Sequence, residues 1–169
     1  MKRVVVYEAK GKTLAKQARP RQNFLKHWRV VRYWARRKYN ITDSDLEILL
    51  YLSDIELFTR KQFKEFEWLL SWDMTRFNTL RDKGYIVQWR EDATRRQAKL
   101  YTLSIAAKRI VTTIYKKLLQ EEHIPENKIN NPIFKGDNYA DKMYRKAIRR
   151  MNAEREKRMI AERERGLGI

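Results

Sequence analysis

One stretch of the chain, residues 58–104, constrains the fold more than any other. It contains two short amphipathic patterns, then a glycine, then two short runs rich in β-branched and aromatic residues. The first pattern starts at Thr59, which together with Gln62 has the spacing of a helix capping box. The second covers residues 72–83 and ends before Gly84, which suits the left-handed conformation that follows many helices. The stretch therefore predicts two consecutive short helices.

A β-hairpin is expected directly after the second helix. Residues 85–90 and 100–103 favour strands, and the charged segment between them suits a turn. Ser71 is the predicted cap of the second helix. The side chains of this helix that the pattern places in the core are Met74, Phe77 and Leu80.

Three further amphipathic helices are expected around this stretch. One runs from about Gln22 to Lys38. Another is opened by a capping box of Thr42 and Asp45, and a third follows Ser104. Their predicted inward residues are, in chain order, Phe24, Leu25, Trp28, Val31 and Trp34 or Ala35; Leu46, Leu49, Leu50 and Leu52; and Ala107, Ile110, Val111, Ile114 and Leu118.

The C-terminal part of the chain is predicted to be a loop followed by a long charged helix. Residues 123–136 contain helix breakers and read as a connecting loop. The last helix runs from about Tyr139 to Arg165, with Asp137 as its predicted cap. Its apolar stripe is Ala140, Tyr144, Ile148 and Met151. Beyond this stripe the charges are of mixed sign, which indicates a helix that is solvated or that depends on a partner.

These elements indicate a mainly α fold with a three-helix core, a β-hairpin, a basic N-terminal arm and long C-terminal helices. Helix, helix and hairpin in this order is the layout of a winged helix, in which the second helix usually enters a DNA groove and the hairpin is the wing. The predicted organisation is a basic arm over residues 1–21, a winged-helix domain with flanking helices over 22–122, a linker loop over 123–136 and a charged C-terminal helix over 137–169.

The positive charge of the chain is concentrated at its ends. The formal net charge is +18. Residues 1–40 hold 13 Lys and Arg against one acid, residues 41–130 hold 15 against 14, and residues 131–169 hold 11 against six. Such a surplus attracts polyanions through counterion release, without specifying a base sequence. It predicts nucleic acid as the partner, although a solubility device is the alternative reading.

Three runs resemble the MarR family of winged-helix transcription regulators. They are TDSDLEILLYLSD, MTRFNTLRDKGYIVQWRED and AKLYTLSIAAKRIV, and the similarity covers about residues 22–120. The resemblance implies a recognition helix ending at Gly84, a wing, and homodimerisation through terminal helices. The family's wing usually carries Asp-x-Arg, whereas Arg95 and Gln97 stand at those places here.

Two groups of candidate DNA-binding residues follow from this reading. The recognition helix offers Thr75, Arg76, Asn78, Thr79 and Lys83 on faces other than the core face. Arg suits guanine, Asn suits adenine, and Thr suits thymine or phosphate. The wing offers Arg90, Arg95, Arg96 and Lys99, because arginines at a hairpin tip favour the negative potential of a minor groove. The alternative is an ordinary solvated surface.

A third group of cations lies in the arm and the first helix. The predicted backbone contacts are Lys16, Arg19, Arg21, Lys26, Arg29, Arg32, Arg36 and Arg37. Interleaved aromatic residues, Trp28 among them, suit stacking on single-stranded bases, but core packing is the more common role at helical spacing.

Enzymatic motifs are weak, so no catalytic residue, cofactor or metal is expected. Gly11-Lys12-Thr13 lacks the earlier glycine of a phosphate-binding loop, which would fall at Val6. The two histidines, His27 and His123, have no partner at metal-ligand spacing. Cysteine is absent, which excludes thiolate chemistry and Cys-based zinc sites.

The function expected from the sequence is binding of duplex DNA by a MarR-like transcription regulator. The alternative is a non-enzymatic structural or assembly component of a nucleoprotein particle such as a virion, ribosome or transcription complex, with the winged helix as a docking module. Expected partners are nucleic acid and either a second copy of the chain or other proteins of an assembly. No apolar run reaches the ~20 residues of a membrane helix. The expected location is cytoplasmic, or associated with a nucleoid or virion.

Overall fold

The structure is a computed structural model that describes residues 24–66, 73–89 and 99–166. This part of the chain is mainly helical and contains one small antiparallel sheet. The helices are α2 (Phe24–Tyr39), α3 (Asp43–Leu52), α4 (Arg60–Glu65), α6 (Met74–Asp82), α7 (Ile105–Leu118) and α8 (Tyr139–Gly166). The strands are β1 (Phe58–Thr59), β2 (Ile86–Gln88) and β3 (Leu100–Leu103), and Pro132–Phe134 form a 3₁₀ turn, η1.

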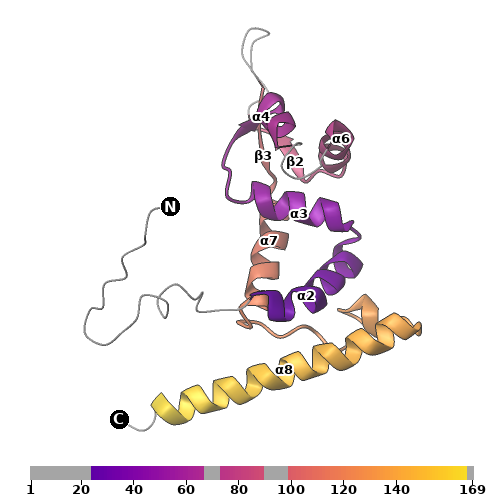
Figure 1. Cartoon of the computed structure of the whole chain (residues 1–169), viewed down its shortest axis with the longest axis vertical. Coiled ribbons are helices and arrows are strands. Elements are labelled where there is room, and N and C mark those ends of the chain that lie inside the picture. The colour runs from indigo at the N-terminus through magenta and orange to yellow at the C-terminus, as the bar shows by residue number, and fades with distance from the viewer. Residues whose placement is uncertain (1–23, 67–72, 90–98, 167–169) are drawn as a thin grey trace, which may run out of the picture.

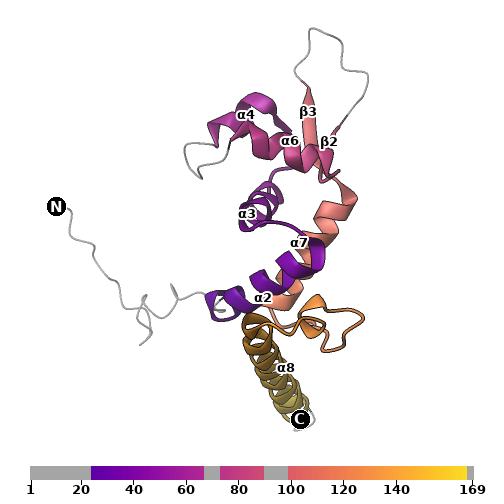
Figure 2. The same cartoon turned by 90° about the vertical axis from the view of Figure 1, so that its right-hand side faces the viewer.

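The elements are arranged between two ends of the molecule. The sheet, α4 and α6 lie at one end, and α8 runs across the other end beneath α2 (Figure 1). The helices α3 and α7 connect the two ends, and the view turned by 90° gives the same order (Figure 2).

The predicted helix starts are confirmed at α3 and α4 and corrected at α6. Thr42 with Asp45, and Thr59 with Gln62, both form complete capping boxes. The α6 helix begins at Met74, and its cap is Asp73, whose carboxylate accepts a hydrogen bond of 2.9 Å from the backbone N–H of Arg76. An aspartate suits this position because it satisfies a free N–H and adds negative charge at the positive helix end. The predicted cap Ser71 lies outside the described residues.

The predicted hairpin is confirmed, and a third strand joins it. Strand β2 pairs with β3 in the register Ile86 to Leu103, and β1 pairs with the other edge of β3, so the strand order is β1-β3-β2. Gly84 has a φ of +73°, as expected for a residue that reverses the chain after α6. The turn brings the strands of the hairpin back against the helix that precedes them.

One hydrophobic cluster extends from the sheet to α8. The rings of Phe63, Phe77 and Tyr101 meet edge to face near the sheet, with centroids 5.0 and 5.2 Å apart. The cluster continues through Ile114 of α7 to Ile148 of α8, and both side chains are fully buried. The predicted stripes of α3 and α7 are largely confirmed, although Leu50 is only partly buried.

The first helix buries a narrower stripe than its sequence suggested. Val31, Trp34 and Ala35 are buried, and Trp28 packs against the core from a partly buried position. Phe24 and Leu25 are exposed by 43% and 78%, so the prediction that they point inward is wrong. They occupy the first turn of the described helix, where a periodic pattern alone does not reveal how far the neighbouring helices extend.

The predicted linker over residues 123–136 runs over the surface at residues 126–130, but both of its ends contribute side chains to the core. Ile124, Asn131 and Ile133 are fully buried, and the Asn131 side chain caps η1. The cap of α8 is Asn138, whose side-chain oxygen accepts a hydrogen bond of 2.7 Å from the backbone N–H of Asp141. Asp137, the predicted cap, is instead an exposed partner of Lys142.

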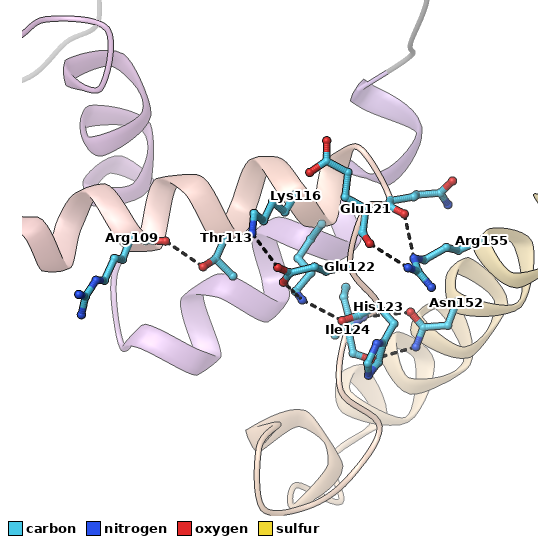
Figure 3. A network of polar contacts seen from close by, with 11 residues as sticks. Arg109, Thr113, Lys116, Glu121, Glu122, His123, Ile124, Asn152 and Arg155 are labelled. Atoms are coloured by element: carbon cyan, nitrogen blue, oxygen red, sulfur yellow. Dashed lines mark hydrogen bonds and ion pairs between the residues drawn. The ribbon is translucent and has the colours of Figure 1, made fainter. Parts of the chain in front are cut away.

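Side chains of α8 attach this helix to the end of α7. Asn152 accepts a hydrogen bond from the N–H of Ile124 and donates one to its carbonyl, at 3.0 and 2.8 Å. Arg155 donates to the carbonyls of Gln120 and Glu121, which lie just beyond the last turn of α7 (Figure 3). These contacts satisfy polar backbone groups that packing would otherwise leave unpaired. None of the helices in the described ranges is long and apolar enough to cross a membrane.

Candidate nucleic-acid interface

The outer face of α6 carries small polar side chains. Phe77 and Leu80 are fully buried and turn the opposite side of the helix to solvent. This outer side carries Thr75, which is exposed, and Thr79, which is partly exposed. The Thr79 hydroxyl donates a hydrogen bond of 2.9 Å to the carbonyl of Thr75. Both threonines were predicted contacts, and the structure leaves them on an accessible helix face.

Two other predicted contacts, Arg76 and Lys83, are held at the side of α6 by α3. The Lys83 Nζ lies 3.0 Å from one carboxylate oxygen of Asp45, and an Arg76 guanidinium nitrogen lies 3.6 Å from the other. The Asp45 side chain is fully buried, whereas the two cations are 40% and 37% exposed. Their charge is therefore partly neutralised inside the protein before any ligand arrives.

The charge of Asp45 is stabilised in its buried position. Burial by itself raises the pKa of a carboxyl group, but hydrogen bonds from Lys83 and from the backbone N–H of Thr42 outweigh this effect and hold the pKa of Asp45 below its ordinary value. Asp45 consequently has two roles, as the acid of the α3 capping box and as the anchor for one side of α6. Only the first role follows from the local sequence, because Lys83 and Asp45 lie far apart in the chain.

Asn78, the fifth predicted α6 contact, is oriented by an arginine of α4. An Arg60 guanidinium nitrogen donates a hydrogen bond of 2.9 Å to the side-chain oxygen of Asn78. The same guanidinium lies over the ring of Phe77, 5.1 Å from its centroid. This arrangement leaves the amide N–H₂ of Asn78 as the group available to an acceptor on a ligand.

A basic recess lies between α4, α6 and the hairpin. It encloses about 680 Å³ and is lined by Thr59, Arg60, Lys61, Arg81, Gln88, Lys99 and Tyr101. The lining contributes four cations, and within the described part of the chain it contains no Asp or Glu. Of these four, only Lys99 was predicted as a contact. The other three come from positions that look like ordinary helix surface in the sequence.

The cations of the first helix are engaged within the protein. Lys26 pairs with Glu154 at 2.8 Å, Arg37 pairs with the buried Asp141 at 3.4 Å, and Arg29 donates to the hydroxyl of Tyr144 at 3.3 Å. These contacts attach α2 to α8.

Two more predicted backbone contacts bind α2 to α3. Arg32 and Arg36 both pair with Asp43, at 3.4 and 2.8 Å. The aromatic residues interleaved with these cations also face the protein: Trp34 is buried, and the ring of Tyr33 stacks on that of Tyr144 with centroids 3.8 Å apart. Stacking on nucleic-acid bases is thus not the role of these rings in this arrangement.

The remaining predicted contacts lie outside the described residues. They are Lys16, Arg19 and Arg21 of the arm, and Arg90, Arg95 and Arg96 of the hairpin. Among the residues that the structure does describe, no three His, Asp or Glu side chains are grouped in a way that would hold a metal ion.

Comparison with known proteins gives no further indication of the family. No family model, no curated protein and no solved structure matches the chain. The resemblance to MarR regulators therefore stays a prediction from the sequence, and the geometry described above is what supports a function.

Proposed function

We propose that the chain is a winged-helix protein that binds duplex DNA as a transcription regulator. In this reading α3, α4 and α6 are the three core helices, α6 is the recognition helix, and β2 and β3 form the base of the wing. Thr75, Asn78 and Thr79 face the bases from α6. The activity is binding, and no chemical step is assigned to the protein.

A single observation carries the proposal: α6 leads directly into an antiparallel hairpin whose inner strand also pairs with β1. This is the β1-β3-β2 order. Thr75 on the outer face of α6 is exposed, and α6 lies at the same end of the molecule as the hairpin (Figure 1). A helix in this position reaches a groove while the hairpin beside it reaches the flanking backbone.

The charge of the molecule supports the same proposal. Since the cations of α2 and two of those on α6 have internal partners, the attraction to DNA has to come from other groups. Lys61, Lys99, Lys108 and Arg109 are exposed and have no ion-pair partner among the described residues. They lie on α4, on the hairpin and on the start of α7, around the end of the molecule that carries α6.

The proposal is tested by selecting duplexes from a random-sequence pool and measuring their affinity over a salt series. We expect a selected duplex to bind roughly a thousandfold or more tightly than random DNA. The double variant Thr75→Ala/Asn78→Ala should lose about 1–3 kcal/mol of this preference for each base contact removed. The control is Thr112→Ala, which removes an exposed threonine of α7 that lies outside the proposed base contacts. Equal affinity for selected and random DNA would overturn the proposal that the protein is a transcription regulator.

A second candidate is an assembly component, and an apolar groove between α2 and α8 favours it. The groove has a volume of about 450 Å³, and its lining includes Val30, Ala140 and Met143. Tyr139, at its edge, is 79% exposed. Exposed apolar surface of this kind is typical of a protein interface. The same salt series separates the candidates, since an assembly protein binds DNA almost without sequence preference, and light scattering measures the number of chains.

A further inference from the structure

We propose that the basic recess is a binding site for phosphodiester groups of the DNA backbone, placed so that one strand passes beside α6. This inference rests on the proposed function and adds a site of which the sequence indicated only Lys99. The described lining of the recess does not include Thr75, Asn78 or Thr79 of the outer face of α6. Its cations come from α4, α6 and the start of β3, which only the folded chain brings together.

The charge of the recess is available to an external anion. Lys61 and Lys99 are exposed and have no hydrogen-bond or ion-pair partner among the described residues. Arg81 pairs with Asp82 at 3.1 Å, but the Asp82 side chain is 68% exposed. Such a surface pair contributes about 0–1 kcal/mol and is screened by salt, so a phosphate competes with it easily. The recess thus keeps most of its positive charge, in contrast to the side of α6 that faces Asp45.

The size and shape of the recess fit a segment of backbone. Its volume of about 680 Å³ lies within the ~300–1,000 Å³ of ordinary ligand sites. It is open on one side, because Lys61 and Lys99 are both exposed at its rim. Lysine and arginine donors around an open hollow whose described lining holds no carboxylate favour a charged, hydrated ligand such as a phosphodiester over an apolar one.

Arg60 places this site next to the residues that face the bases. Its guanidinium lines the recess and also donates to the side-chain oxygen of Asn78, 2.9 Å away. A phosphate held by Arg60 and Lys61 therefore lies one side chain away from Asn78 on the outer face of α6. A phosphate bound here would fix the position of α6 relative to the DNA strand. Contacts to the DNA backbone usually have this role in recognition.

The test compares two double variants that remove the same charge from different places. Lys61→Gln/Lys99→Gln removes the two unpaired cations of the recess, and Lys128→Gln/Lys146→Gln removes two exposed lysines elsewhere on the chain. For a random-sequence duplex, each lost phosphate contact should lower the magnitude of the log–log salt slope by about 0.9. We expect the recess variant to lose about 1–2 units of slope and roughly 10- to 100-fold in affinity at 0.1 M salt. The control variant should keep nearly the wild-type slope.

Each outcome decides between the claims. If both double variants change the slope equally, the effect is one of net charge and the recess is not a site. If the recess variant binds as the wild type does while Thr75→Ala/Asn78→Ala loses its preference, the recess inference fails and the proposed function stands. If the wild type shows no salt-dependent binding to duplex DNA, both fail. Inorganic phosphate is the control ligand, and its binding is followed through the backbone amide signals around Lys61. If phosphate fills the site without displacing DNA, the site serves a free anion and the proposal that it binds the DNA backbone is overturned.

Discussion

The carboxylate of Asp45 is buried while both of its cationic partners remain in contact with water. Asp45 joins two elements directly, since it caps α3 and holds the side of α6 through Arg76 and Lys83. A buried carboxylate is stable only with such partners, because burial alone disfavours its charge. The orientation of α6 therefore depends on a residue of a different helix.

Replacing this residue tests its role through stability and pH. Asp45→Asn should lower the free energy of unfolding at pH 7 by about 1.5–3 kcal/mol, the value for a charge-assisted hydrogen bond. Because the pKa of Asp45 is lowered in the folded state, its contribution is complete above its ordinary value of 3.8 and is lost as the pH falls through the folded pKa. Urea unfolding at several pH values should show the difference from wild type shrinking below about pH 4. Asp43→Asn, which affects partly exposed pairs, should cost about 1 kcal/mol or less.

At the scale of elements, α8 depends on contacts to backbone groups as much as on apolar packing. Its apolar stripe ends at Met151, and the following turn is held by Asn152 and Arg155 on the carbonyl groups after α7 (Figure 3). A pattern of hydrophobic residues does not reveal such contacts. They explain why a helix rich in charges lies firmly against the rest of the protein.

Removing the side-chain amide of Asn152 should therefore weaken the contact between α8 and Ile124 in particular. Asn152→Ala leaves the N–H and carbonyl of Ile124 without their partner, which should cost about 1–3 kcal/mol. Hydrogen exchange at the backbone amide of Ile124 should become faster than in the wild type, and the amides of the sheet should be affected less. The control is Asn130→Ala, an exposed asparagine in the same connecting segment, for which a change within about 0.5 kcal/mol is expected. An equal loss of stability in Asn152→Ala and Asn130→Ala would contradict the role given to the Asn152 hydrogen bonds.

At the scale of the whole molecule, buried side chains from the segments predicted over residues 22–122, 123–136 and 137–169 form one core in the described part of the chain. The buried side chains continue from Phe58 of β1 to Met151 of α8. A single cluster of this kind predicts one cooperative unfolding transition rather than an independent melting of the C-terminal helix.

Two methionines of α8 provide a matched test of this cooperativity. Met151 is 4% exposed and Met143 is 46% exposed. Met151→Ala should cost about 2–5 kcal/mol and shift the unfolding transition measured by tryptophan fluorescence and by far-UV circular dichroism together. Met143→Ala should change stability by about 0.5 kcal/mol or less. Two separate transitions in the wild type would show that α8 unfolds on its own.

Most of the parts of the fold that depend on neighbouring residues were predictable from the sequence, although the caps of α6 and α8 were misplaced by one or two residues, whereas the parts that depend on distant residues were not predictable. The caps at Thr42, Thr59 and Ser104 and the reversal at Gly84 are local, and the structure confirms them. The basic recess is assembled by the pairing of β1 with β3, which brings the start of α4 beside the start of β3. The sequence around Arg60 does not predict that β1 pairs with β3.

The charges of the first helix show the same limit. A cationic face reads as a surface for polyanions, yet Lys26 and Arg37 meet acids of α8 more than 100 residues later in the chain. Whether a cation is free depends on which acids the fold brings to it. Lys61 became a candidate only through the structure, and Lys99, which the sequence already indicated, stays one because no such acid lies beside it among the described residues.

The position of α8 at the end of the molecule opposite to α6 has one more consequence (Figure 1). The groove between α2 and α8 and the basic recess lie far apart in the described part of the chain, so the two proposed binding sites do not overlap there. If both proposals hold, DNA at one pole leaves the other pole free for a protein partner.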